Sequence, residues 1–250
     1  NTTLQAGYRD VPPATEQRTP ATHPRLIENT PHWGKFSTDL YRSMVREAAQ
    51  KCLRDGLSLI PLRPRTKQPK AAWKQYARRM PRQEEVSEWF SGKECLNVGV
   101  VCGAVSGNLV VIDFDTEDAI KRYRDWIEEM SSKTLTVSTG RGLHVFLRTR
   151  EAVRSTTFEG GDVKAEGSYV AFPPSLHPQG AHYAQVSDGD TNEILQWPSY
   201  TLPMVELHPV SKLNGPAIHD QDVSSEVTHE SPTSIQEFSG ELRRFVRHNE

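Results

Sequence analysis

The sequence has few of the features that mark membrane, secreted and zinc-binding proteins. It holds three cysteines in 250 residues, Cys52, Cys95 and Cys102, and their spacing fits neither a disulfide framework nor a structural zinc site. No apolar run approaches the roughly 18–20 residues that a membrane helix needs, and no secretory signal opens the chain. We therefore expect a cytoplasmic protein that binds no zinc and no membrane. Because it begins at Asn1, we expect a fragment of a longer protein.

Apolar residues are also scarce. They make up 36% of the chain, against about 45–50% in globular domains on a count that includes glycine. Residues 1–36, which are interrupted by prolines, are predicted to form a flexible tail. Residues 205–250 are predicted to form an acidic linker with a short C-terminal helix. The domain expected between them, 37–204, is long enough for a substantial core.

The net charge is close to zero, but the charges are unevenly distributed. The chain has 30 Lys and Arg against 32 Asp and Glu, a formal charge of −2. Residues 41–80 contain eleven basic and two acidic side chains, a local charge of +9, whereas residues 201–250 carry −4. This balance argues against a uniformly basic DNA-coating protein, but it leaves room for a basic patch that binds a polyanion.

Hydrophobic periodicity predicts helices early in the domain and strands later. Apolar residues recur at helical spacing after a possible cap at Thr38, after a helix start at Pro81, and within residues 117–130. Strand patterns occur at 57–62, 97–102, 109–115, 134–137, 143–148, 162–165, 169–172 and 182–186. This order indicates an α+β fold with a mixed or antiparallel sheet.

An apolar strand pattern ends in two acids, Asp113 and Asp115. Residues two apart on a strand lie about 6.5–7 Å apart at Cα and share a face, so both carboxylates point the same way. Such a pair repels itself unless something neutralises it. Two Mg²⁺ or Mn²⁺ ions about 3.5–4 Å apart would do so, because these cations prefer oxygen ligands. The alternative is an exposed strand end, where Asp115 or Thr116 only caps the next helix.

A glycine-rich turn joins two later strands. Gly140 and Gly142 free backbone N–H groups to face an anion, while Ser138 and Arg141 add a hydroxyl and a fork of charged donors. His144 follows and could donate to a phosphate oxygen, although it could also be an ordinary half-buried strand histidine. The turn suits a triphosphate, but it is neither a Walker A loop nor a Rossmann turn.

A third acid, Asp162, begins another strand, and alternation places Lys164 on the same face. Asp162 would complete a two-metal site, with Lys164 as a partner for phosphate or for the acids. The alternative is a surface ion pair between these two residues alone.

In this order the motifs resemble the bifunctional DNA primase/polymerase (prim-pol) domain of the archaeo-eukaryotic primase superfamily, found in plasmid and phage replication proteins. The resemblance covers about residues 40–200 and rests on Asp113-Phe114-Asp115, on Ser138 to His144, and on Asp162-Val163-Lys164 followed by Gly-Ser-Tyr-Val-Ala-Phe-Pro-Pro-Ser. It implies a small α/β unit packed against an RRM-like sheet, with the active site in the cleft between them.

The resemblance also implies roles for residues. The acids that would bind two Mg²⁺ or Mn²⁺ ions and carry catalysis are Asp113, Asp115 and Asp162. The residues that would bind the incoming nucleotide are Ser138, Gly140, Arg141, His144 and Lys164. The implied activity is template-directed DNA priming and polymerisation with dNTPs and NTPs on a single-stranded template and primer. We expect this fragment to be a monomer and the full-length protein to work with a helicase domain or subunit.

Two other functions stay open at this stage. The same acids could serve a metal-dependent nuclease or phosphodiesterase, which would need no triphosphate site. The chain could also be a non-catalytic DNA-binding module of a replication complex, although bare paired acids would repel DNA phosphates.

A basic segment lies between the first predicted strand and the second predicted helix. Cationic side chains release counterions when they bind a polyanion, and an aromatic ring can stack on an unpaired base. The residues expected to contact template or triphosphate are Arg63, Arg65, Lys67, Lys70, Trp73 and Lys74. The alternative is a solvated loop with Trp73 turned into the core.

Overall fold

The computed structural model describes residues 37–187 and 189–210. They all belong to one of the two units of the chain, Lys35–Glu250, and only this unit is described below. The predicted N-terminal tail and most of the predicted C-terminal linker, with its helix, lie outside the described residues. Within them, no helix is long and apolar enough to cross a membrane.

The first part of the domain combines two helices with a three-stranded antiparallel sheet. The helices are α1 (Thr38–Arg54) and α2 (Gln83–Ser91), and the sheet order is β1 (Leu59–Leu62), β2 (Asn97–Val101), β8 (Tyr169–Phe172). Ser37 caps α1, not Thr38 as expected, because its hydroxyl accepts from the backbone N–H of Leu40. The short 3₁₀ helix η2 (Lys74–Ala77) precedes α2, and a second one, η3 (Ala104–Ser106), follows β2.

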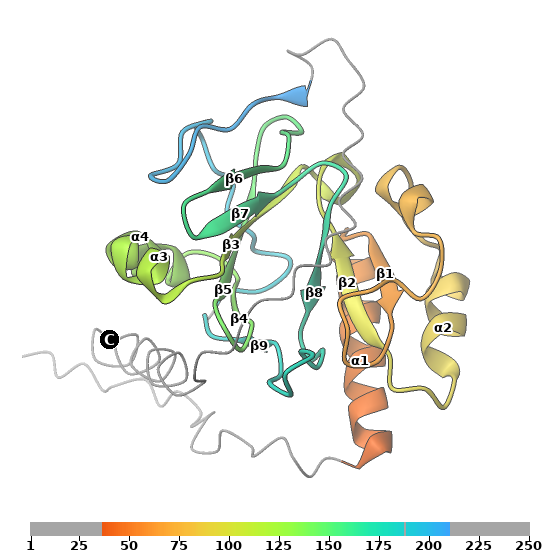
Figure 1. Cartoon of the computed structure of the whole chain (residues 1–250). Coiled ribbons are helices and arrows are strands. Elements are labelled where there is room, and N and C mark those ends of the chain that lie inside the picture. The colour runs from red at the N-terminus through yellow and green to blue at the C-terminus, as the bar shows by residue number, and fades with distance from the viewer. Residues whose placement is uncertain (1–36, 188, 211–250) are drawn as a thin grey trace, which may run out of the picture. The chain divides into compact units, whose positions relative to one another are not determined.

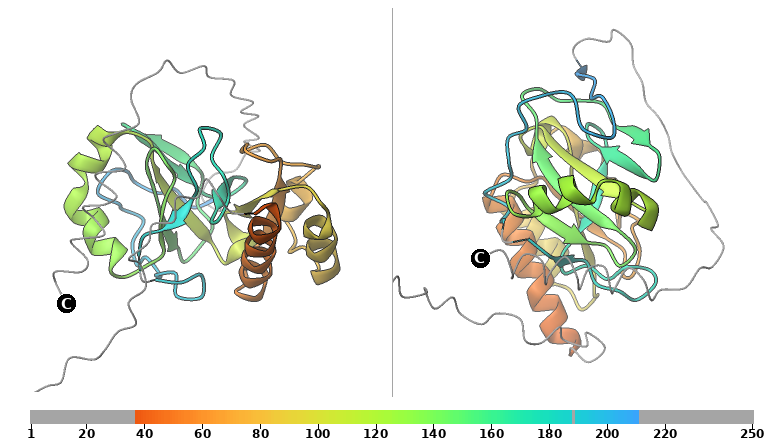
Figure 2. Two further views of the ribbon diagram at one scale, coloured as in Figure 1. Left: turned by 90° about the horizontal axis from the view of Figure 1, so that it is seen from below. Right: turned by 90° about the vertical axis from the view of Figure 1, so that its left-hand side faces the viewer.

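The second part is a six-stranded sheet in which every neighbouring pair is antiparallel. Its order is β6 (Thr156–Phe158), β7 (Gly161–Lys164), β3 (Leu109–Phe114), β5 (Leu143–Arg148), β4 (Thr136–Ser138), β9 (Ala184–Gln185). Helices α3 (Glu117–Arg122) and α4 (Arg124–Ser131) cover one face of this sheet, as Figures 1 and 2 show. The helix predicted at 117–130 is therefore two helices, because the backbone of Tyr123 leaves the helical region.

Alternation along β3 divides the core between the two faces of the six-stranded sheet. Ile112 and Phe114 pack under α3 and α4 in one buried cluster. Val111 points to the other face, into a larger cluster shared with α1, α2 and the three-stranded sheet. Asp113 lies two residues after Val111, so it shares this second face. The first acid therefore stands where the larger core meets the end of strand β3.

The α+β class and the antiparallel sheet predicted from the sequence are confirmed. Strand β6 has no counterpart among the predicted strands. Residues 205–210, which the sequence placed in the linker, lie against the domain. Leu207 is buried and the backbone N–H of Val210 donates to the carbonyl of Ala152 at 2.9 Å.

Candidate active site

Three strands bring an acid, a second acid and a histidine into one row. Strand pairing sets Asp113 of β3 opposite His144 of β5 on one side and opposite Asp162 of β7 on the other. Directly opposed residues on neighbouring strands project on the same face of the sheet. The three candidate side chains, which are far apart in sequence, therefore lie side by side on the face that continues into the larger core.

Asp113 and His144 form the buried centre of this row. Asp113 is 6% exposed and His144 is 2% exposed, and the Asp113 Oδ1 atom lies 3.1 Å from the His144 Nε2 atom. Burial opposes ionisation of Asp113, but attraction from His144, Lys67 and Lys164 keeps its pKa below the usual value. The His144 Nδ1 atom is buried and finds no hydrogen-bond partner among the described residues. The pair is thus a buried centre in which one histidine nitrogen has no partner among the described residues.

Lys164 balances the second acid of the row. Its Nζ atom lies 2.5 Å from the Asp162 Oδ2 atom. Burial disfavours the charged form of Lys164, but Asp162, Asp113 and Asp115 together raise its pKa. The ion pair between Asp162 and Lys164 that the sequence suggested is therefore present. It is not isolated, because Lys164 also interacts with Asp113 and Asp115.

Asp115 stands just beyond the end of β3, with its side chain open to solvent. Desolvation by the surrounding protein, followed by repulsion from Asp113 and Asp162, raises its pKa to about 6. The capping role belongs to Thr116, whose Oγ1 atom accepts from the Ala119 N–H at 3.2 Å. Asp115 therefore has no capping role to explain its position beside two other acids.

Three carboxylates on one side of a sheet offer the oxygen ligands that Mg²⁺ and Mn²⁺ prefer. Among residues 37–187 and 189–210, no three His, Cys, Asp or Glu side chains are already drawn together around one metal position. Instead, His144 and Lys164 pair with two of the carboxylates. Asp115 keeps a raised pKa in spite of attraction from Lys67 and Lys164. A divalent cation would stabilise its charged form, so the donor set fits such an ion.

The glycine-rich turn is held tightly against the end of β3. A Cβ atom on Gly142 would lie 1.7 Å from the Phe114 carbonyl oxygen, so only glycine fits there. The Gly142 N–H donates to the Thr139 Oγ1 atom at 3.0 Å, so it is not free for an anion as the sequence suggested. Gly140 adopts a φ of 92°, and a Cβ there would lie 2.5 Å from the Cβ of Ala181. The turn is thus fixed between the acids and residue 181.

Two nucleotide-binding candidates of this turn point in different directions. Ser138 pairs with Leu143 and donates to the Ala184 carbonyl at 3.3 Å, so strand alternation places its side chain on the face opposite His144. The structure does not bring Ser138 to the other candidates. Arg141 is exposed, and its Nε atom donates to the Gln179 Oε1 atom at 2.6 Å.

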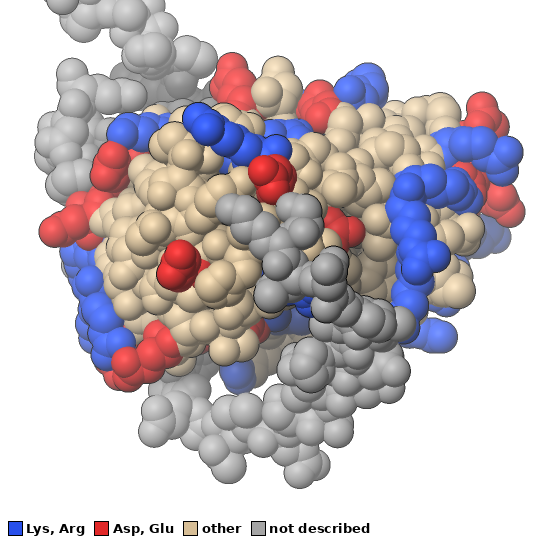
Figure 3. All heavy atoms as spheres, turned by 90° about the horizontal axis from the view of Figure 1, so that it is seen from above, with Lys and Arg blue, Asp and Glu red and all other residues tan. Residues whose placement is uncertain are grey.

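The basic segment separates into residues that face the acids and residues held elsewhere. Lys67 attracts both Asp113 and Asp115 and favours their charged forms, which only partly offsets the rise in the pKa of Asp115. Its charge therefore reaches the acid row, which consists of Asp113 and Asp162 with the adjacent Asp115. Lys70 is paired with Glu94. Arg63, Arg65 and Lys74 have exposed side chains. Figure 3 shows Lys and Arg gathered toward the right of the face seen from above, over the part that carries η2 and α2.

Trp73 is half-buried, as the alternative interpretation of this segment expected. Its ring lies edge-on to Tyr169, with ring centroids 4.8 Å apart. It also lines a small hollow together with Tyr76 and Trp89. A role of Trp73 in stacking on DNA stays a prediction.

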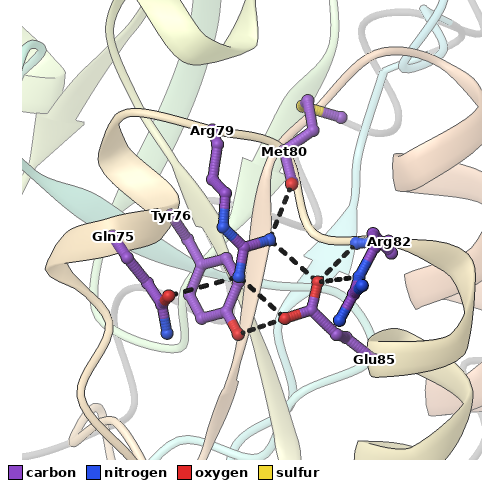
Figure 4. Close-up of polar contacts among 6 residues, drawn as sticks. All are labelled: Gln75, Tyr76, Arg79, Met80, Arg82 and Glu85. Carbon is purple, nitrogen blue, oxygen red and sulfur yellow. Dashed lines mark hydrogen bonds and ion pairs between the residues drawn. The ribbon is translucent and has the colours of Figure 1, made fainter.

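The end of the same segment is tied to α2. Figure 4 shows Arg79 binding both carboxylate oxygens of Glu85, each at 2.8 Å, while its guanidinium lies 4.8 Å from the ring centre of Tyr76. Arg79, then the backbone N–H of Arg82, hold the pKa of Glu85 far below its usual value. The charge of Arg79 is therefore used within the fold.

A loop beside the acid row carries none of the motifs that the sequence offered. His177 is 8% exposed, and its Nδ1 atom accepts from the Gln179 N–H at 3.2 Å. Tyr183 stands between two histidines, with its ring centroid 5.9 Å from that of His144 and 5.9 Å from that of His177. The available signal was a histidine and a tyrosine within a loop rich in glycine and proline, directly after the third motif.

Asn97 was also missed, although it joins two functional segments. Its Nδ2 atom donates to the carbonyls of Thr66 at 3.1 Å and Leu176 at 2.8 Å. Its Oδ1 atom accepts from the Leu176 N–H at 2.9 Å and from the Tyr41 hydroxyl at 2.7 Å. One buried amide thus holds the basic segment against the start of the loop that carries His177.

A family model described as the N-terminal domain of bifunctional DNA primase/polymerase matches residues 49–200. The matched part includes the acid row, the glycine-rich turn, the basic segment and the loop that carries His177. No curated protein matches the chain.

Proposed function

This chain belongs to the bifunctional DNA primase/polymerase family, and on that premise we propose that it makes primers on single-stranded DNA and extends them by two-metal nucleotidyl transfer. The family implies a primase and polymerase function in DNA replication. The observation that supports the two-metal chemistry is the row of Asp113 and Asp162 with Asp115 beside it, where desolvation, and then repulsion from the other two acids, raise the pKa of Asp115.

Asp113, Asp115 and Asp162 would hold two Mg²⁺ or Mn²⁺ ions in this proposal. When bound, such ions activate the attacking 3′-hydroxyl and stabilise the pyrophosphate that leaves. His144 and Lys164 lie next to the carboxylates and supply donors for phosphate oxygens. Priming differs from extension in that the first nucleotide supplies the hydroxyl.

The exposed residues of the basic segment would hold the template by charge. Arg63, Arg65 and Lys67 are exposed and lie on the strand-to-helix connection that Asn97 anchors. Partners in this proposal are a single-stranded template, a primer, dNTPs and NTPs, and a helicase domain or subunit of a plasmid- or phage-type replication protein.

The test incubates the protein with primed and unprimed single-stranded DNA, labelled dNTPs or NTPs, and Mg²⁺ or Mn²⁺. We expect extended primers on the first template and new short products on the second. The double variant Asp113→Asn with Asp115→Asn should make neither. The matched control is Asp125→Asn, an exposed acid of α4, which should retain activity. Absence of product with the native chain, or product from the double variant, overturns the proposal, and shortened DNA in its place would favour a nuclease.

A further inference from the structure

The row of side chains that begins at the acids continues past His144 to a hairpin loop. Leu176 and His182 form an antiparallel bridge, and the His177 N–H donates to the Ala181 carbonyl at 2.7 Å. Gly180 turns the loop at a φ of 93°. The loop folds the His177 ring inward against Tyr183, whose other neighbour is the His144 ring. The loop therefore forms the side of the site opposite the acids.

His177 presents one hydrogen-bond donor from a fixed ring. Because its Nδ1 atom accepts from the Gln179 N–H, the neutral ring carries its proton on Nε2. No described residue accepts a hydrogen bond from that Nε2 atom. Burial, and then repulsion from Lys67, Arg141 and His144, lower the pKa of His177 to about 4. Near neutral pH the ring thus stays neutral and keeps its Nε2–H donor.

Arg141 is fixed beside this ring. Gln179 binds the Arg141 Nε atom at 2.6 Å, and no other described residue binds the two terminal amino groups of the guanidinium. The close approach of Gly140 to Ala181 holds the glycine-rich turn and the loop together. Gln179 therefore orients both groups: its backbone N–H fixes His177, and its side chain fixes Arg141.

Lys67 completes a group of donors. Its charge acts on His177 as well as on Asp113 and Asp115, so it lies near both sides of the site. Asn97 fixes the Thr66 carbonyl, next to Lys67, to the start of the loop. Two cations and a neutral N–H donor, from three separate segments, thus lie near one another. Such a group of donors is suited to phosphate oxygens.

We propose that His177, Arg141 and Lys67 bind the terminal phosphates of the incoming nucleoside triphosphate, with Gln179 as the positioning residue. This inference rests on the proposed function, in which the acids act at the α-phosphate. The ligand chemistry is a phosphate group. A DNA backbone phosphate has the same chemistry, so the test separates nucleotide from DNA.

The test measures binding by calorimetry in Mg²⁺, with dATP, dAMP and a primer–template as separate ligands. His177→Ala should weaken dATP binding by about tenfold, the loss typical of one good hydrogen bond to a charged group. Binding of dAMP and of primer–template should change by less than about twofold on the same reasoning. Gln179→Ala should give the same pattern more weakly, because Arg141 keeps its charge. His177→Gln should recover part of the affinity, because its amide can donate from a similar position.

The control is His208→Ala, an exposed histidine outside the site, which should bind all three ligands as the native chain does. An equal loss for dATP and dAMP, a loss confined to primer–template, or no loss at all overturns the inference. These binding measurements need no turnover. If the native chain makes no product but His177→Ala selectively loses dATP binding, the proposed function is overturned and the phosphate site stands. If the native chain is active but His177→Ala binds dATP normally, the phosphate site is overturned and the proposed function stands.

Discussion

The charge of Asp115 destabilises the metal-free folded protein, so Asp115→Asn should increase the free energy of unfolding. The pKa of Asp115 rises from 3.8 to about 6 through desolvation and through repulsion by Asp113 and Asp162. A rise of this size is equivalent to about 3 kcal/mol of destabilisation at neutral pH. Because the side chain reaches solvent, screening reduces the expected gain to about 1 kcal/mol. For a domain of this size, that gain raises the melting temperature by about 2–4 °C.

The pH dependence has a definite sign. A carboxyl group whose pKa is raised by folding binds its proton more tightly in the folded than in the unfolded chain. The cost of Asp115 is therefore fully present above about pH 6 and vanishes as the pH falls below 3.8. The native chain and Asp115→Asn should differ in stability at neutral pH and converge near the lower value.

The assay is urea unfolding in the presence of EDTA across this pH range, with Asp125→Asn as the control for removing an exposed acid. Added Mg²⁺ should stabilise the native chain more than Asp115→Asn, and the variant should be inactive in primer extension. The reasoning is refuted if Asp115→Asn is less stable than the native chain at neutral pH without metal. A stability difference that does not change with pH would refute it as well.

Three further predictions test the parts around the acids. Asn97→Ala should cost about 3 kcal/mol in urea unfolding, because it leaves several buried hydrogen-bonding groups without partners. Lys67→Gln should raise the KM for dNTPs about tenfold in primer extension, whereas Lys70→Gln, which removes a charge already paired with Glu94, should change it by less than about twofold. Gly142→Ala should lower both stability and activity, measured by unfolding and primer extension, because its Cβ would collide with the Phe114 carbonyl.

Local sequence rules point to the acids but not to their neighbours. The alternation of a strand predicts that Asp113 and Asp115 share a face, because that relation lies within six residues of chain. The alignment of Asp113 with His144 and Asp162 depends on the register between separate strands, which no local pattern states. A change of one residue in such a register moves a side chain to the other face. Ser138 illustrates this. It pairs with Leu143 and not with His144, so its side chain projects from the other face of the sheet.

The loop that carries His177 was beyond sequence reasoning for a different reason. His177 lies in a polar loop rich in glycine and proline, where no periodicity predicts burial. It is buried only because the loop folds onto Tyr183 and the glycine-rich turn. The role of Asn97 likewise depends on segments 31 and 79 residues away. A single asparagine at the start of a strand carries no signal of such contacts.

The basic side chains of residues 41–80 fall into two groups: those that pair with an acid within the fold, and those that do not. Arg79 and Lys70 are neutralised by Glu85 and Glu94 and so contribute to holding the fold together. Around the acids, uncharged groups hold the segments in place instead: the amide of Asn97, the hydroxyl of Thr139 and the amide of Gln179. A hydrogen bond from a neutral group fixes a loop without consuming the charge that a ligand must meet. The side chain of Lys67 and the terminal amino groups of Arg141 therefore have no partner within the described part of the chain. A triphosphate with its cations would relieve both the excess positive charge there and the repulsion at Asp115.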